Sequence, residues 1–148
     1  MFKIVTVPNC VLSTPTKLVL EIDNSIKKIV SDMERVLIAQ DDPPGVGLAA
    51  NQVGILKQII VVLVNNEPKV MINPEILDFS REYCIMNEGC LSFPQQFYDI
   101  QRPERVKVKY RGLNGHPMIE WHEGIEARCI LHEIDHIRGI VFTEKLNG

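Results

Sequence analysis

The first part of the chain has apolar residues spaced three and four positions apart, which is the spacing of one face of an α-helix. The pattern runs over residues 16–40 and comprises Leu18, Ile22, Ile26, Ile29, Met33, Val36 and Leu37. The segment DDPP (41–44) follows, and proline cannot continue a helix because it lacks a backbone N–H. The sequence therefore predicts an amphipathic helix over residues 16–40, followed by a loop of small residues, 45–50.

The middle of the chain has the patterns of β-strands. Residues 57–64 are apolar and β-branched, which predicts a buried strand, and residues 70–72 and 75–83 continue the sheet on either side of Asn73-Pro74. Residues 105–111 alternate strictly between apolar and basic, which is typical of a half-buried antiparallel strand. Its apolar face consists of Val106, Val108 and Tyr110, and its basic face of Arg105, Lys107, Lys109 and Arg111.

The last part of the chain predicts a hairpin and a second helix. Asn114-Gly115 is typical of a tight turn into a strand near 117–121, and residues 124–138 form a helical pattern that ends near Gly139. One helix, a run of strands and a final helix favour an α+β fold. We expect one domain over residues 1–148, with antiparallel or mixed sheets packed around the C-terminal helix and a further helix on the N-terminal side.

Composition narrows the class of protein. The 148 residues are 45% hydrophobic and 24% charged, with a net charge of −3, whereas broad nucleic-acid binding needs a basic face. The longest apolar run covers residues 59–64, far short of the roughly 20 residues that cross a bilayer. The N-terminal residues lack the pattern of a signal peptide. We therefore expect a cytoplasmic protein that binds neither membranes nor specific nucleic-acid sequences, with its four cysteines reduced.

The basic face of residues 105–111 has two interpretations. It is either a solvated surface or a docking stripe for an acidic partner such as ribosomal RNA. The first is favoured, because alternating basic residues are common on exposed sheet faces.

The segment CILHEIDH (129–136) suggests a metal site on the final helix. His132 and His136 are one turn apart and about 40° apart around the axis, so they can share one divalent ion. Glu133 lies beside them and can accept a proton from water and deliver it to a leaving amine. Asp135 can orient an imidazole or remain a solvated acid. The alternative interpretation is a pair of buried core histidines.

Two histidines do not complete a catalytic site, which needs a third protein ligand. Downstream, Glu144 and the chain terminus are the only acids. Cys129 is on the histidine face but about 10 Å along the axis from His136, so a regular helix cannot bring both to one ion. It is better explained as a core or pocket residue.

Other donors lie earlier in the chain. His116 and His122 lie on or beside a strand without distinguishing context, and Cys84 lies in an apolar strand. Cys90 differs, because Gly89 before it and a proline soon after it allow the backbone to bend and aim the thiolate. Spacing alone favours Cys90 without excluding the others.

Three segments together resemble the motifs of peptide deformylase. They are GVGLAANQ (45–52), EGCLS (88–92) and HEIDHIRG (132–139), in that family's order and near its spacing, and the resemblance covers roughly residues 25–142. It implies a metal site of Cys90, His132 and His136 and a general acid/base, Glu133. It further implies an oxyanion hole formed by the Gln52 side chain and the Leu91 backbone N–H, a kind of site worth about 3–4 kcal/mol per donor.

The resemblance also implies the reaction and the cofactor. The expected activity is hydrolysis of the N-formyl group on the initiator methionine of nascent chains, giving formate and a free amine. The expected partners are N-formylmethionyl peptides. Thiolate and imidazole donors accept Fe²⁺, Zn²⁺, Ni²⁺ or Co²⁺, and the resemblance favours Fe²⁺.

The substrate pocket is expected to use residues near the metal, with Gly47 letting a substrate strand approach its backbone. Glu88 and Arg102 form either a pair near the site or a surface salt bridge. The pocket candidates are Val46, Gly47, Met86, Glu88, Gly89, Ile125 and Cys129.

Two departures from the family pattern affect these expectations. Leu131 occupies a position where glutamine is common, which removes a polar group but no ligand. The chain has only nine residues after Gly139, so a further C-terminal helix is not expected and ribosome docking is weakened.

Two other functions remain open from the residues. The first is a general zinc peptidase that uses the same helix. The second is a non-catalytic metal module that binds N-termini.

Overall fold

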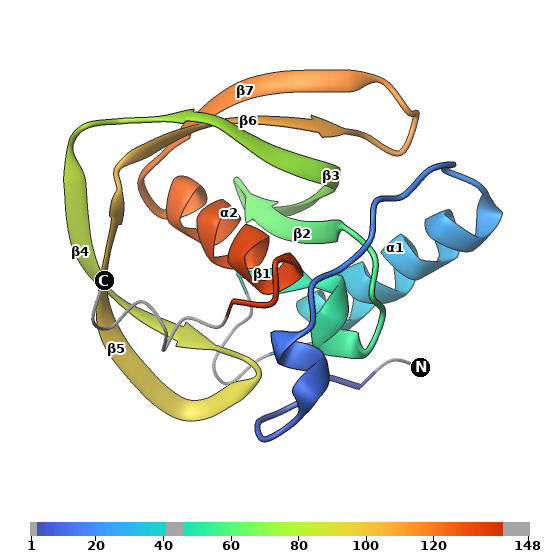
Figure 1. The fold of residues 1–148 in the computed structure, drawn as a ribbon, viewed down its shortest axis with the longest axis horizontal. Coiled ribbons are helices and arrows are strands. Elements are labelled where there is room, and N and C mark those ends of the chain that lie inside the picture. The colour runs from blue at the N-terminus through green and yellow to red at the C-terminus, as the bar shows by residue number, and fades with distance from the viewer. Residues whose placement is uncertain (1–2, 41–45, 141–148) are drawn as a thin grey trace.

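The structure, a computed structural model, describes residues 3–40 and 46–140 (Figure 1). The helices in these ranges are η1 (Cys10–Ser13), α1 (Asn24–Ile38), η2 (Ala50–Val53) and α2 (Gly124–Ile137), where η denotes a 3-10 helix. The strands are β1 (Gly47–Ala49), β2 (Ile59–Val64), β3 (Glu67–Phe79), β4 (Tyr83–Cys90), β5 (Phe93–Pro103), β6 (Arg105–Arg111) and β7 (Pro117–Glu123).

The strands form two antiparallel sheets around the last helix. One sheet has the order β1-β2-β3-β6-β7, and the other contains β4 and β5. Figure 1 shows α2 at the centre with strands of both sheets around it, and α1 on the other side of β1 and β2. The predicted α+β fold, with antiparallel sheets packed around the C-terminal helix, is confirmed.

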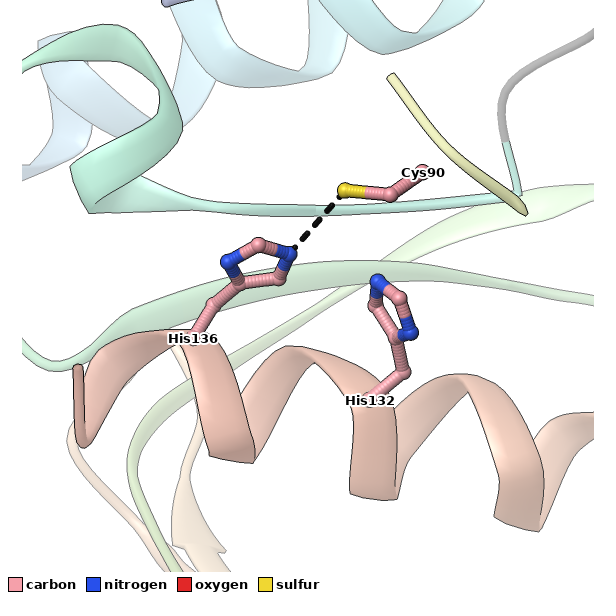
Figure 2. A group of neighbouring side chains, drawn as sticks. All are labelled: Cys90, His132 and His136. Atoms are coloured by element: carbon pink, nitrogen blue, oxygen red, sulfur yellow. Dashed lines mark hydrogen bonds between the residues drawn. The ribbon is translucent and has the colours of Figure 1, made fainter. Parts of the chain in front are cut away.

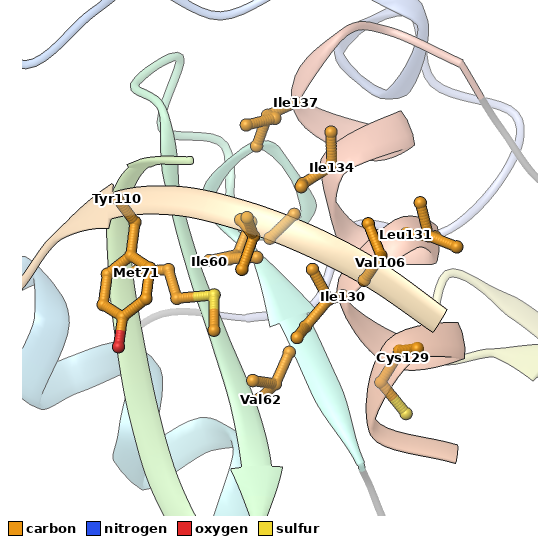
Figure 3. Packing of buried hydrophobic residues seen from close by; sticks show 13 residues of the cluster. Ile60, Val62, Met71, Val106, Tyr110, Cys129, Ile130, Leu131, Ile134 and Ile137 are labelled. Carbon is orange, nitrogen blue, oxygen red and sulfur yellow. The ribbon is translucent and has the colours of Figure 1, made fainter. Parts of the chain in front are cut away.

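The longest apolar run in the sequence forms strand β2, which is buried on both faces. Ile60 and Val62 pack in the cluster that contains the apolar side of α2 (Figure 3), whereas Ile59 and Val61 pack in the cluster that contains α1. All four side chains are completely buried. Because each such residue contributes about 1.5–3 kcal/mol when fully buried, β2 fixes both helices to the sheet.

The first helix is shorter than predicted. It begins at Asn24, where the Asp23 carboxylate accepts a hydrogen bond from the backbone N–H of Ile26 and caps the first turn. Residues 16–22 contain a bridge at Lys17 and no helix, so the prediction of helix there is wrong. The reason is tertiary: Lys17 forms a bridge with Lys57, and the side chain of Asn73 bonds both backbone groups of Val19. The predicted end of the helix at 41–44 lies outside the described residues.

The sheets also differ from the predicted strands in three places. Residues 47–49, expected in a loop, form the buried strand β1 beside β2. The predicted break at Asn73 is a bulge within the continuous strand β3, with φ of 53° at Asn73. No strand was predicted over residues 93–103, because prolines and polar residues obscure its alternation. β5 forms there because β4 pairs with it.

The alternating strand 105–111 is confirmed as β6, with its apolar residues buried. The neighbouring strands place acids beside its cations: Asp78 is opposite Lys107, Glu75 opposite Lys109 and Glu123 opposite Arg105. This balance of charge favours a solvated face over a docking stripe. Within the described ranges, no helix has the length and apolar character needed to span a membrane.

Candidate active site

Helix α2 places its polar residues inside the protein. His132 and His136 lie one turn apart with ring centroids separated by 4.9 Å. Glu133 and Asp135 between them are also buried, at 4% and 7% exposure. Burying charged groups is costly unless they are paired or bind a metal, so this helix face requires partners.

Cys90 supplies the partner for the two histidines. It ends β4, immediately after a shift in the register of pairing with β5. Its Sγ lies 3.1 Å from Nε2 of His136, and the donor atoms of Cys90, His132 and His136 all lie within 4.8 Å of one another (Figure 2). Among the described residues this is the one group of three such side chains whose spacing could hold a metal ion.

The alternative third ligands do not join this group. Cys129 is buried in the cluster beside α2 and lines the adjoining cleft, and burial raises the pKa of its thiol to about 12. His122 contacts Glu120 and Glu126, and Cys84 lies on β4 away from the cluster. Glu144 lies outside the described residues.

Glu88 and Arg102 form a buried pair behind the histidines. Arg102 donates to the Glu88 carboxylate from Nε at 2.6 Å and from Nη2 at 3.0 Å, and it donates to Asp135 at 2.9 Å. Both side chains of the pair are 5% exposed, so the interpretation as a surface salt bridge is wrong. Asp135 is likewise a partner of Arg102 and not a solvated acid.

Glu88 also fixes the orientation of His132. Its Oε1 lies 2.9 Å from Nδ1 of His132, which leaves Nε2 to face Cys90. Burial acts to raise the pKa of Glu88, but hydrogen bonds from His132 and Arg102 lower it to about 2. A permanently ionised Glu88 makes His132 a better donor to a cation.

The charges of the site fit a divalent cation. Burial acts to lower the pKa of His132, yet hydrogen bonds with Cys90 and Glu88 raise it to about 10, which shows how strongly the surroundings attract positive charge. Burial and the charges of His132 and Arg102 lower the pKa of His136, which keeps that ring neutral. When ionised, the buried acids and the thiolate carry two more charges than the adjacent arginines neutralise: Glu88, Cys90, Glu133 and Asp135 against Arg102 and Arg128.

Glu133 reaches the open side of the same group. It lines the cleft, and its Oε1 is buried without a hydrogen-bond partner among the described residues. Burial raises its pKa to about 7, which suits a group that takes and returns protons near neutral pH. A Cβ at Gly47 would lie 2.6 Å from Oε2 of Glu133, so the glycine makes room for this carboxylate.

Gly47→Ala should therefore lower kcat/KM on the order of 100-fold, because a displacement of about 1 Å in a catalytic group costs that much. The activity that the resemblance implies, release of formate from a formylated peptide, checks this when it is measured across substrate concentrations. Gly112→Ala is the matched control, since a Cβ there meets only the Asn114 side chain, away from the cleft. Equal rates in Gly47→Ala and wild type would show that Glu133 does not need its observed position.

Gln52 is held with its amide nitrogen toward Cys90. Its Oε1 accepts the backbone N–H of Ala49 at 2.9 Å, and Nε2 donates to Ser92 Oγ at 3.1 Å and lies 3.6 Å from Cys90 Sγ. Sequence reasoning did not find Ser92, which is completely buried. It also did not find Asn51, whose side chain donates to the backbone oxygen of His136 at 2.5 Å.

A cleft of about 490 Å³ opens beside these residues and is lined by every predicted pocket residue: Val46, Gly47, Met86, Glu88, Gly89, Ile125 and Cys129. Glu88 nevertheless directs its carboxylate to His132 and two arginines. Phe93 and Phe97 were not predicted, although both line the cleft. A Cβ at Gly89 would overlap the Phe97 ring, so the two residues depend on each other.

An HExxH helix whose histidines meet a thiol donor beside an open cleft is the arrangement of a metal-dependent hydrolase. Comparison with known proteins agrees. The family model described as polypeptide deformylase matches residues 1–148. A peptide deformylase of Thermosynechococcus vestitus is 43% identical over 143 residues, 93% of this chain and 74% of the relative.

Solved structures of this family are also similar to the chain. The crystal structure of peptide deformylase from Thermotoga maritima superposes with a TM-score of 0.92 at 39% identity, covering 99% of this chain and 97% of that one. A Met-Ala-Ser-bound deformylase from Acinetobacter baumannii gives 0.89 at 33% identity, covering 97% of each chain. The chain belongs to the polypeptide deformylase family. It is a hydrolase that removes the N-formyl group from nascent polypeptides.

Proposed function

We propose that residues 1–148 form a single catalytic domain that holds one divalent metal ion through Cys90 Sγ and the Nε2 atoms of His132 and His136. The observation that carries this proposal is the convergence of these donors within 4.8 Å of one another, in surroundings with an excess of negative charge. An ion bound there would act as a Lewis acid that polarises the formyl carbonyl. It would also lower the pKa of water, so that hydroxide is available to attack near neutral pH.

The residues around the donors then have distinct roles. Glu133 accepts the proton of the attacking water and passes it to the departing amine nitrogen, so that the formyl C–N bond breaks to give formate and a free α-amine. The Gln52 amide and the backbone N–H of Leu91 donate hydrogen bonds to the formyl oxygen as it gains negative charge. Ser92 and Ala49 keep the amide nitrogen of Gln52 directed inward.

The cleft accommodates the substrate methionine and the residues after it. Val46, Met86, Ile125 and Cys129 provide apolar walls, and Gly47 and Gly89 allow a peptide backbone to approach closely. The Acinetobacter baumannii relative was crystallised with Met-Ala-Ser bound, which supports an extended peptide as the ligand of this cleft. Glu88 contributes by orienting His132.

Formate release from formyl-Met-Ala-Ser by the metal-loaded protein tests this proposal. We expect turnover with the formylated peptide and no cleavage of an unblocked peptide of the same sequence. Internal cleavage of the unblocked peptide would instead indicate a general zinc peptidase. Metal binding without either reaction would indicate a non-catalytic module.

We further propose Fe²⁺ as the ion bound in the cell, since a thiolate and two imidazoles accept it and the family resemblance favours it. Iron-loaded protein prepared without oxygen should lose formate-releasing activity on exposure to air, because Fe²⁺ and its thiolate ligand are oxidisable. Protein loaded with Zn²⁺ or Ni²⁺ should keep its activity under the same exposure. Undiminished activity in air with iron still bound contradicts the assignment.

The place of action follows from the substrate. Formylated nascent chains emerge from ribosomes, so we propose that the enzyme works in the cytoplasm at or near them. Acidic residues balance the basic residues of β6, which does not favour a broad electrostatic docking surface on this sheet. The balance supports recognition of the formylated chain end itself.

A further inference from the structure

Arg128 is a buried arginine to which the proposed mechanism gives no role. It is 7% exposed and lies on α2 one turn before His132. Its Nη1 donates to Oε2 of Glu88 and, at 3.0 Å, to the backbone oxygen of Ile100. Its Nη2 donates to the backbone oxygen of Cys84 at 2.7 Å. One guanidinium thus bonds to three residues on two strands.

Those two strands have little other backbone support. Among the strands that the structure describes, β4 and β5 pair with each other and not with the five-stranded sheet. An isolated pair of strands is marginally stable in water. The hairpin packs on one side against Leu12 through Phe93 and Ile100. On the side of α2 its position depends on side-chain bonds, and Arg128 bonds to both strands.

The position of the hairpin determines the geometry of the metal donors. Cys90 is two residues after Glu88 on β4, whereas His132 and His136 belong to α2. A displacement of β4 along α2 would move the sulfur away from both imidazoles. It would also remove Glu88 from Nδ1 of His132.

We propose that Arg128 is a positioning residue that holds β4 at the distance from α2 at which Cys90, His132 and His136 meet at one ion. The inference rests on the metal site proposed above. Arg102, which lies on β5, also links Glu88 to Asp135 on α2. Arg128 differs because its side chain, coming from α2, donates to backbone oxygens of both β4 and β5.

The chemistry requires arginine at this position. A guanidinium has a planar fork of five donors, whereas a lysine ammonium is a compact point charge that cannot reach acceptors spread over two strands. Arg128 also borders a second cleft of about 540 Å³, whose lining includes none of the three proposed metal ligands. Glu82, Glu104 and Glu123 line that cleft with one other arginine, Arg105, and this excess of acids would attract a small cation entering it.

Cobalt binding to Arg128→Ala tests the proposal. We expect Co²⁺ affinity to fall about 10- to 100-fold, the usual effect of removing a group that orients metal ligands. The thiolate-to-cobalt charge-transfer absorption should weaken as well. Millimolar guanidinium should restore part of both signals by entering from the second cleft, whereas methylammonium, with the same charge, should not. Arg138→Ala is the matched control, because Arg138 lies exposed at the end of the same helix.

Arg128→Lys keeps the positive charge of the side chain but removes the geometry of the guanidinium. It also provides a second test if the alanine variant fails to fold. Positioning predicts that the lysine variant also binds Co²⁺ weakly and has a weakened charge-transfer band. Wild-type affinity and absorption in either variant would overturn the inference. Tighter Co²⁺ binding in Arg128→Ala would also overturn it, since that result would make Arg128 only a competing positive charge.

The failure of this inference is distinguishable from failure of the proposed function. Wild-type protein that shows no thiolate-to-cobalt band or releases no formate contradicts the proposed function. Wild-type protein that shows both, with an Arg128→Ala variant that binds cobalt equally well, contradicts only the role of Arg128.

Discussion

Glu133→Ala should lose formate release while retaining the metal. The carboxylate is not among the three converging donors, so its removal leaves Cys90, His132 and His136 in place. It is the buried acid with a free oxygen at the cleft, and general acid–base groups contribute about 10²- to 10⁴-fold to rate. We expect kcat to fall by that factor, with metal content measured on the same sample.

Glu75→Ala is the control for this variant. Glu75 is an exposed acid on β3, far from the cleft lining, and its loss should change neither rate nor metal content. Comparable rates in wild type and Glu133→Ala would remove Glu133 from the mechanism and favour a non-catalytic role. Loss of metal together with activity would instead assign Glu133 to the metal ligands.

Cys90→Ala should release the metal. The substitution leaves two imidazoles and removes the one donor that comes from outside α2. Removal of groups that merely orient ligands costs about 10- to 100-fold in affinity, so loss of a ligand should exceed that range. Competition with a chelator, followed by metal analysis, measures the change, and formate release should disappear with the metal.

Cys129→Ala provides a close comparison, because it removes a sulfur from the same cleft without touching the donor group. It should keep wild-type metal affinity, and its effect should appear in KM or in stability. A variant of Cys129 that loses metal as readily as Cys90→Ala would show that the helix and β4 do not hold the observed arrangement.

Sequence periodicity predicted the elements whose buried residues recur at regular intervals along the chain. The alternation of 105–111 and the helical repeat of 124–138 appear in the structure at nearly the same residues. Periodicity was wrong for 16–23, since distant partners outweigh local helical preference. There the backbone of Lys17 bonds to Leu56 and Gln58, and that of Val19 bonds to the Asn73 side chain. It missed β5 because that strand owes its existence to pairing with β4.

The candidate site, like the fold, could be predicted from the sequence only in part. Spacing on one helix was enough to associate His132 with His136 and to exclude Cys129. It was not enough to select Cys90 over other donors, and that choice came from the resemblance of three short motifs. Asn51 and Ser92 lie within two of these motifs, but no role was assigned to them, and Arg128 lies outside all three. Their roles depend on contacts with residues 40 to 85 positions away.

The sequence by itself determined the fold class, the helix face that carries the two histidines and Glu133, and the family that its motifs resemble. These properties follow from the regular 100° turn of a helix and the alternation of a strand, which are local. Only the tertiary structure decided how β4 meets α2, through a buried network of Glu88, Arg102 and Arg128. In that network, charged side chains from distant segments pair in the low-dielectric interior of the protein, and no local sequence pattern predicts such pairs.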